Sequence, residues 1–102
     1  MFQHVVLMRW REDMPVESLL QIEEALCDLS RRSADLIDYQ HGPNVGSDQR
    51  NWDYGVVATF ADALGFARFR DDAHHLALID RLIHTWLADR AAIQIGDAGL
   101  MT

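Results

Sequence analysis

Lysine is absent from this sequence, cysteine occurs once, and no apolar run approaches the length of a membrane span. A span needs about 20 consecutive apolar residues, and the N-terminus lacks the basic segment of a signal peptide. The single cysteine, Cys27, has no partner for an internal disulfide, and its place in a helical pattern predicts a small core residue. We therefore expect a cytoplasmic protein that does not interact with membranes.

Positive charge is scarce as well. Nine arginines stand against 16 aspartate and glutamate residues, which gives a net charge of -7. Nucleic acids bind surfaces on which positive charge is clustered, because such surfaces displace counterions. The composition therefore argues against a nucleic-acid partner. The three tryptophans are more typical of a core or an interface than of platforms that stack bases.

Motifs that hold metals, phosphates or cofactors are also missing. The sequence has no HExxH pair, no paired cysteines, no phosphate-binding loop and no nucleophile elbow. Asp72, His74 and His75 lie close together, but ligands so near one another at a helix start rarely converge on one metal ion. Asp72 is better explained as the N-cap of the helix that follows. We expect neither a metal nor a cofactor.

The 102 residues have the length and composition of one globular domain, with residues 96–102 as a mobile tail. Alternating apolar residues predict four strands, at residues 2–10, 36–40, 52–60 and 92–95. Residues 41–51 read as a loop because they are rich in glycine, proline and asparagine. Helical spacing predicts one helix from about Pro15 to Arg31–Arg32, a short helix capped by Asp62, and a helix from Asp72 to about Arg90.

This order of elements, β-α-β-β-α(α)-β, is typical of the α+β, ferredoxin-like (split βαβ) plan. That plan is a four-stranded antiparallel sheet with helices on one face. Val5 and Leu7 of the first strand and Val57 of the third would make the other face apolar, so it needs a partner. We predict a homodimer in which two sheets stack face to face about a twofold axis.

The long helix carries the residue that most needs an explanation. Counted from His75, the residues at helical spacing are Ile79, Leu82 and Trp86, so an imidazole heads an apolar stripe. His84 lies on the opposite side and suits a solvent-exposed surface. His75 is either a partly buried histidine satisfied by one hydrogen bond or a functional residue, and the pattern leaves both interpretations open.

Several segments resemble those of the stress-responsive A/B barrel (Dabb) family, namely Phe2-Gln-His4-Val-Val-Leu, Gly42-Pro-Asn44, the strand ending at Thr59-Phe60, and the stretch from Phe69 to Leu78. The resemblance implies a dimeric α/β barrel with a pocket in each subunit, between the sheet and the helices. In a polyketide cyclase of this family, the working residues are a histidine on the long helix, a histidine on the first strand and a tyrosine on the preceding helix. These positions hold His75, His4 and Phe69 here, so the phenol is missing from its usual place.

The pattern and the resemblance together suggest a cofactor-independent enzyme that acts on a small hydrophobic, oxygenated, polyketide-like substrate by cyclase, isomerase or lyase chemistry. His75 would be the general acid or base, and His4 would orient it or the substrate. We expect the substrate to contact Val6, Met8, Tyr54, Val56, Phe69, Ile79 and Trp86. The alternatives are a non-catalytic dimeric module that binds an apolar metabolite and a cofactor-free monooxygenase.

Overall fold

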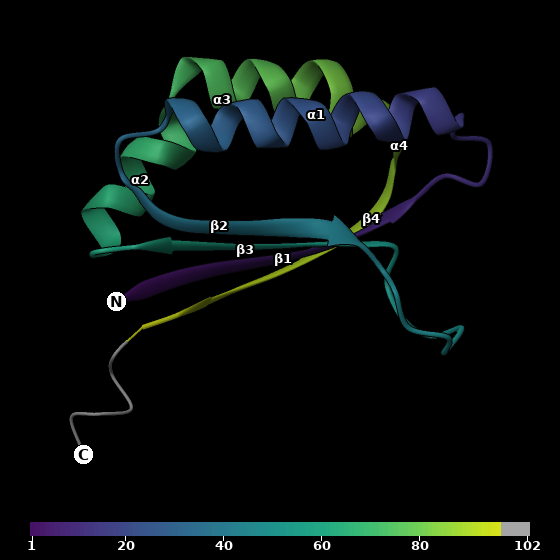
Figure 1. The fold of residues 1–102 in the computed structure, drawn as a ribbon, viewed down its shortest axis with the longest axis horizontal. Helices are drawn as coiled ribbons and strands as arrows, with labels where there is room; N and C mark the ends of the chain where they lie inside the picture. Colours follow the sequence, from purple (N-terminus) through teal and green to yellow (C-terminus); the bar gives the residue numbers. More distant parts are fainter. Residues whose placement is uncertain (97–102) are drawn as a thin grey trace.

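A computed structural model describes residues 1–96 of the chain. It contains one antiparallel sheet of four strands in the order β2-β3-β1-β4, with the helices on one face (Figure 1). The α+β, ferredoxin-like plan predicted from the sequence is confirmed. The elements in chain order are β1 (Phe2–Trp10), α1 (Val16–Arg32), β2 (Leu36–Pro43), β3 (Tyr54–Phe60), α2 (Ala63–Asp71), α3 (Ala73–Leu78), the π-helical turn η1 (Ile79–Ile83), α4 (His84–Trp86) and β4 (Leu87–Ile95). The predicted tail lies outside the described residues from position 97 onward.

β1 is a central strand, and its register decides which side chains face the helices. His4 lies opposite Ala58 of β3 and Gln94 of β4, and Met8 lies opposite Arg90. Residues that are directly opposite in a sheet share a face. The helix-facing side therefore collects His4, Met8 and their partners, while Val5 and Leu7 point to the other side.

α1 forms where the apolar spacing predicts it and ends at Arg32. Ile22, Leu26 and Leu29 are buried against the sheet, because spacings of three and four place them on one face of the helix. The prediction that Cys27 belongs to the core is wrong, since its side chain is exposed. Cys27 lies about 100° around the helix from Leu26 and so falls beside the buried face.

The prediction of two separate helices is confirmed, since α2 ends at Asp71 and α3 begins at Ala73, and both predicted caps are present. The Asp62 carboxylate accepts a hydrogen bond from the Gly65 amide at 2.9 Å, and that of Asp72 accepts one from the His74 amide at 3.0 Å. Each cap satisfies an amide that has no partner within its helix, so two helices begin only ten residues apart.

The long helix differs from its prediction in phase and in length. A π-helical turn adds a residue to the turn over Ile79–Ile83, so that the buried residues of this segment are Leu78 and Ile83, five positions apart. The helix ends at Trp86 rather than near Arg90, and β4 starts at Leu87 rather than at residue 92. β4 pairs along nearly the whole of β1, and this pairing outweighs the helical propensity of the alanine-rich segment.

β2 is also longer than predicted. It extends through Pro43, because its residues pair with β3 as far as Tyr54, and the predicted loop therefore starts three residues later. Pro43 is compatible with this position, since β2 is an edge strand and one side of its backbone needs no ladder donor. The extension places His41 in the sheet, opposite Val56.

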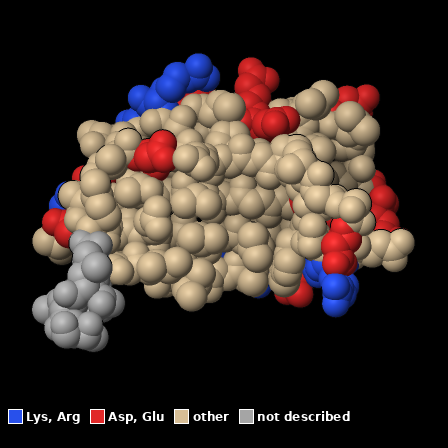
Figure 2. All heavy atoms as spheres, turned by 60° about the horizontal axis from the view of Figure 1, so that its bottom comes forward, with Lys and Arg blue, Asp and Glu red and all other residues tan. Residues whose placement is uncertain are grey.

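The face of the sheet without helices is apolar. Leu7, Ile93 and Ile95 expose 38%, 58% and 49% of their surface, and Val5 lies between Val57 and Ile93 in the register. Figure 2 shows this side, with charged side chains towards the margins of a broad uncharged area. An apolar area of this kind is typical of an interface. Within residues 1–96, no helix is both long enough and apolar enough to cross a bilayer.

Candidate functional site

A cavity of about 420 Å³ lies between the sheet and the helical segment that runs from the end of α2 through α3 and η1 to the start of α4. This volume is within the range of small-molecule sites. Most of its wall is apolar and comes from Val6, Met8, Val56, Ala58, Phe69, Leu76, Ile79, Ile83 and Leu87. The polar side chains that reach it are those of His4, Tyr39, Arg70, His75, His84 and Arg90. An apolar chamber with few polar groups can hold a hydrophobic molecule and act on one part of it.

The predicted site residues mostly meet in this cavity. His4, His75, Val6, Met8, Val56, Phe69 and Ile79 line it. Tyr54 and Trp86 do not. Tyr54 is buried at the other end of the sheet, near Trp10, and its hydroxyl is hydrogen-bonded to His41. Trp86 lies at the end of the helical layer, with the Arg11 guanidinium 6.0 Å from its ring.

His75 is held at the start of α3 with a defined tautomer. Its Nδ1 lies 3.1 Å from the carbonyl oxygen of Arg70. A carbonyl oxygen only accepts, so Nδ1 carries the proton and Nε2 keeps its lone pair. Burial lowers the pKa of His75, against the opposing effects of the Arg70 carbonyl and Asp72. The ring packs on Phe69 with 4.5 Å between centroids. His75 therefore offers a neutral imidazole that can accept a proton.

His4 has the opposite arrangement. The side-chain amide of Gln94 donates to His4 Nδ1 at 2.8 Å, so the neutral ring carries its proton on Nε2. Burial, followed by the charges of Arg90 and His75, lowers the pKa of His4 to about 4. The two imidazoles thus provide complementary groups at one cavity, a lone pair on His75 and an N–H on His4.

Tyr39 also lines the cavity, although the sequence pattern did not single it out. It lies opposite Ala58 in the register, so it faces the helices, and its ring centroid is 6.2 Å from that of Phe69. Its hydroxyl forms no hydrogen bond to any of residues 1–96, and burial raises its pKa, so the phenol stays protonated. The alternation of side chains along a strand could have revealed it, because Tyr39 and His41 are two positions apart in β2 and therefore share one face of the sheet.

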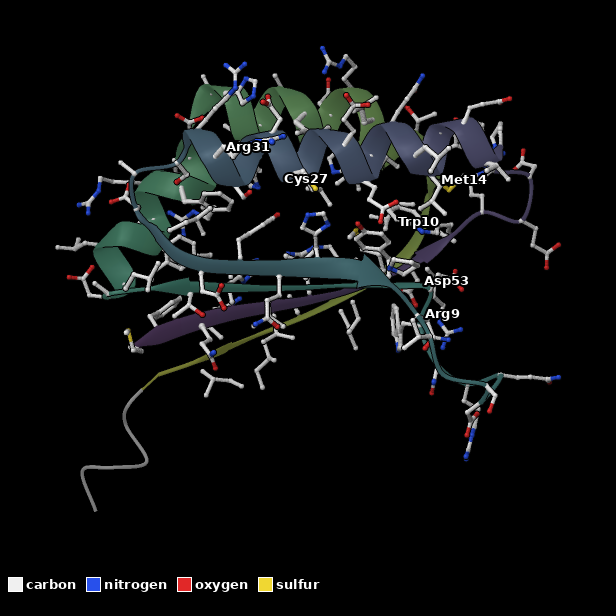
Figure 3. The ribbon with its side chains drawn as sticks, viewed as in Figure 1. Arg9, Trp10, Met14, Cys27, Arg31 and Asp53 are labelled. Carbon is white, nitrogen blue, oxygen red and sulfur yellow. The ribbon has the colours of Figure 1, made fainter. Side chains whose placement is uncertain are left out.

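A second polar chain links α1 to the sheet outside the cavity. Cys27 Sγ lies 3.3 Å from His41 Nε2, and His41 Nδ1 lies 2.7 Å from the Tyr54 hydroxyl. Figure 3 shows the Cys27 side chain extending from α1 towards the sheet. Burial lowers the pKa of His41, and the charge of Glu23 partly opposes this shift. These contacts between Cys27, His41 and Tyr54 hold α1 against the edge strand β2.

Metal ligands are not gathered in the described part of the chain. Within residues 1–96, no group of three or more histidine, cysteine, aspartate or glutamate side chains has a geometry that could hold a metal ion. Asp72, the carboxylate nearest to His75 in sequence, accepts hydrogen bonds from two helix amides.

Comparisons with known proteins give a family and a fold. The model of the Stress responsive A/B Barrel Domain family (Dabb) matches residues 2–95. No curated protein matches the sequence. A dimeric ferredoxin-like protein of unknown function from Thermobifida fusca is 30% identical, with 93% of this chain and 89% of that chain covered and a TM-score of 0.85.

More distant structures share the fold. A Dabb family protein from Mesorhizobium loti is 13% identical, with 93% and 94% of the two chains covered and a TM-score of 0.80. The hydroxynitrile lyase from Passiflora edulis is 14% identical, with 92% and 90% covered and a TM-score of 0.80. At such identities, the likeness establishes a common architecture.

Proposed function

The chain belongs to the stress-responsive A/B barrel (Dabb) family, and from this premise we propose that it is a cofactor-independent enzyme of the cyclase, isomerase or lyase type. Its substrate would be a small hydrophobic, oxygenated molecule of polyketide-like character. The observation that carries the proposal is the pair of half-buried imidazoles, His4 and His75, which line one apolar cavity with opposite proton placement.

The proposed chemistry starts with proton abstraction beside a carbonyl group. Nε2 of His75 takes the proton from the carbon, and the electron pair of that C–H bond moves towards the carbonyl oxygen. The N–H of His4 and the hydroxyl of Tyr39 are the donors available to the negative charge on that oxygen. The enolate carbon can then attack a second carbonyl carbon of the substrate, whose C=O π electrons move to its oxygen, and that oxygen takes the proton from the His75 imidazolium. In an isomerisation, the imidazolium instead returns the proton to another carbon of the conjugated enolate.

Tyr39 gives this site a phenol even though Phe69 occupies the position of the family tyrosine. The two rings are in contact, and the Tyr39 hydroxyl is free to bind a substrate within the described part of the chain. Because burial raises its pKa, the phenol is a donor at neutral pH. We therefore assign to Tyr39 the role of binding the substrate oxygen.

The fold is compatible with such an enzyme. The Passiflora edulis protein of the same architecture is named as a hydroxynitrile lyase, so this architecture hosts a lyase. A second candidate function is non-catalytic binding of an apolar metabolite. It is favoured by the largely apolar wall of the cavity and by the absence of a hydroxyl at Phe69.

Proton exchange separates the two functions without knowledge of the true substrate. A β-keto ester with an alkyl chain is incubated with the protein in D₂O, and loss of the acidic C–H signal is followed by NMR. We expect the protein to exchange this proton faster than buffer alone does. A His75→Gln variant should lower that rate enhancement at least about 100-fold. His74→Gln is the matched control, because His74 is adjacent but does not line the cavity.

The outcomes are distinct. Wild-type exchange equal to buffer, with the ester still bound, would support the binding module and overturn the enzyme. Unchanged exchange in His75→Gln would remove His75 from the mechanism while leaving an enzyme.

We also propose that the chain forms a homodimer through the uncovered sheet face. The support is the exposed apolar surface of Leu7 and Ile93, together with the dimeric state named for the Thermobifida fusca protein. Light scattering should give twice the mass of the chain, and Leu7→Asp should give monomers. Leu20→Asp, which changes an exposed leucine on α1, should remain dimeric. A stable wild-type monomer would refute the proposal.

A further inference from the structure

Arg90 lies at the cavity in a position that the proposed chemistry does not use. It is opposite Met8 in the register, so it stands on the helix-facing side of the edge strand β4, beside the apolar chamber. Arg90 is exposed, so its permanently charged guanidinium remains accessible to water and to a charged group of a ligand.

The other arginines show how unusual this position is. Five of them form an ion pair with an aspartate carboxylate: Arg11, Arg32, Arg50, Arg68 and Arg70. The Arg90 guanidinium holds none among residues 1–96, and Asp89 accepts only the backbone amide of Arg90. Arg9, Arg31 and Arg81 also lack a carboxylate partner there, but none of these three lines the cavity.

A second hollow of about 410 Å³ adjoins the first one. The two share His4, His75, Phe69, Arg70 and Arg90, so both histidines stand where the hollows meet. The side chain of Gln94 closes part of the second hollow. Two guanidinium groups line it, and its wall is more polar than that of the first hollow because most of its lining residues are polar: His4, Arg70, His75, Arg90 and Gln94.

Of these two guanidinium groups, Arg90 is the one available to a ligand. Arg70 already binds the Asp71 carboxylate through Nε at 2.8 Å and Nη2 at 2.9 Å. The net charge of -7 repels anions at a distance, but carboxylates more than about 8 Å away are largely screened at physiological salt. Arg90 therefore gives the junction a positive charge without a carboxylate partner among residues 1–96, whereas the nearby Asp72 carboxylate is hydrogen-bonded to the amides of His74 and His75.

We infer that the ligand is an amphipathic carboxylic acid whose carboxylate pairs with Arg90 in the second hollow while its apolar body fills the first. The inference rests on the proposed function and deepens it by naming the substrate class. A planar guanidinium matches a carboxylate through two parallel hydrogen bonds. The carbons next to the head group then lie between His4 and His75, so a 3-oxo acid fits the acid and base groups.

Two probes of equal chain length test the head group. Octanoate and 1-octanol are titrated calorimetrically into the full chain at low and at physiological salt. We expect octanoate to bind at least about tenfold more tightly than octanol, as a charge-assisted contact implies. Arg90→Gln should reduce that ratio to near one without weakening octanol. Arg81→Gln, which removes an exposed arginine outside the cavity, should keep it. Arg90→Lys should keep part of the preference for octanoate over octanol. Circular dichroism checks that each variant folds.

Each other result counts against the inference. Equal binding of octanoate and octanol to the wild type would overturn the carboxylate class, and so would no binding of either probe. A preference for octanoate that survives in Arg90→Gln would overturn the role of Arg90. These results differ from a failure of the proposed function, which would leave the carboxylate preference intact while the β-keto ester shows no exchange.

Discussion

Protonation of His4 should destabilise the folded chain, and its surroundings determine by how much. Burial, Arg90 and His75 lower the pKa of His4 from 6.5 to about 4. In the unfolded chain the imidazole keeps its ordinary pKa. Between pH 6.5 and 4 the unfolded state therefore binds more protons than the folded state. The free energy of unfolding is at its full value above pH 6.5 and falls as the pH is lowered through this window.

The size of the effect follows from the same pKa. A fall from 6.5 to about 4 corresponds to at most about 3.4 kcal/mol, at about 1.36 kcal/mol per pH unit. The ring is only half-buried, so water screens part of the unfavourable charge, and we expect about 1 to 2 kcal/mol. His75 acts in the same direction, since burial also lowers its pKa.

Urea unfolding of wild-type protein and of His4→Gln, from pH 7.5 to pH 4.5, measures this contribution. The protein concentration is kept constant, because dimer formation would make stability depend on it. Carboxylates contribute equally to both proteins and cancel in the difference. We expect the wild type to lose about 1 to 2 kcal/mol more than the variant over this range. The His74→Gln control should follow the wild type. Parallel curves for wild type and His4→Gln would refute the reasoning.

Two further predictions concern stability at pH 7.5. Tyr54→Phe removes the hydroxyl that lies 2.7 Å from Nδ1 of His41 and keeps the buried ring, so it should cost about 1 to 2 kcal/mol in urea unfolding; a cost near zero would contradict the hydrogen bond. Asp72→Ala removes the acceptor for the His75 amide and should cost about 1 kcal/mol, whereas Asp71→Ala, at an exposed ion pair, should cost less than about half of that; equal costs would argue against the cap.

The topology could be predicted because the central elements follow local rules. Alternation in β1 assigns His4 and Met8 to one face and Leu7 to the other, and the register confirms this assignment. The spacing of Ile22 and Leu26 in α1 likewise marks its buried side. Both elements pack against the middle of the sheet, where burial is strong enough to be visible in the pattern of residues.

The boundaries that were predicted wrongly depend on partners distant in the sequence. β4 begins at Leu87 because it pairs with β1 some 80 positions earlier, and β2 continues through Pro43 because β3 pairs with it. The π-helical turn is a third such case. It moves the buried positions to Leu78 and Ile83, and nothing in the apolar spacing shows the extra residue.

The polar groups that the sequence did not reveal come from these same segments. Tyr39 lies on β2 and Arg90 on β4, the two edge strands, whereas the sequence pattern predicts a helix as far as Arg90. An edge strand can place a long polar side chain over a cavity while its head stays near water. The central strand β1, which has neighbours on both sides, contributes one imidazole to the same cavity.

This division gives the site two parts with different origins. The apolar chamber and the histidines come from elements whose burial the sequence shows, whereas the phenol and the guanidinium come from edges defined by strand pairing. Phe69 illustrates the consequence. A hydroxyl missing from the helix does not leave the cavity without a phenol, because Tyr39 reaches it from the sheet. In a fold of this kind, a functional group that is absent from its usual position in a motif can be supplied by a side chain of another helix or strand. The chemistry of the pocket therefore depends on all the side chains around it.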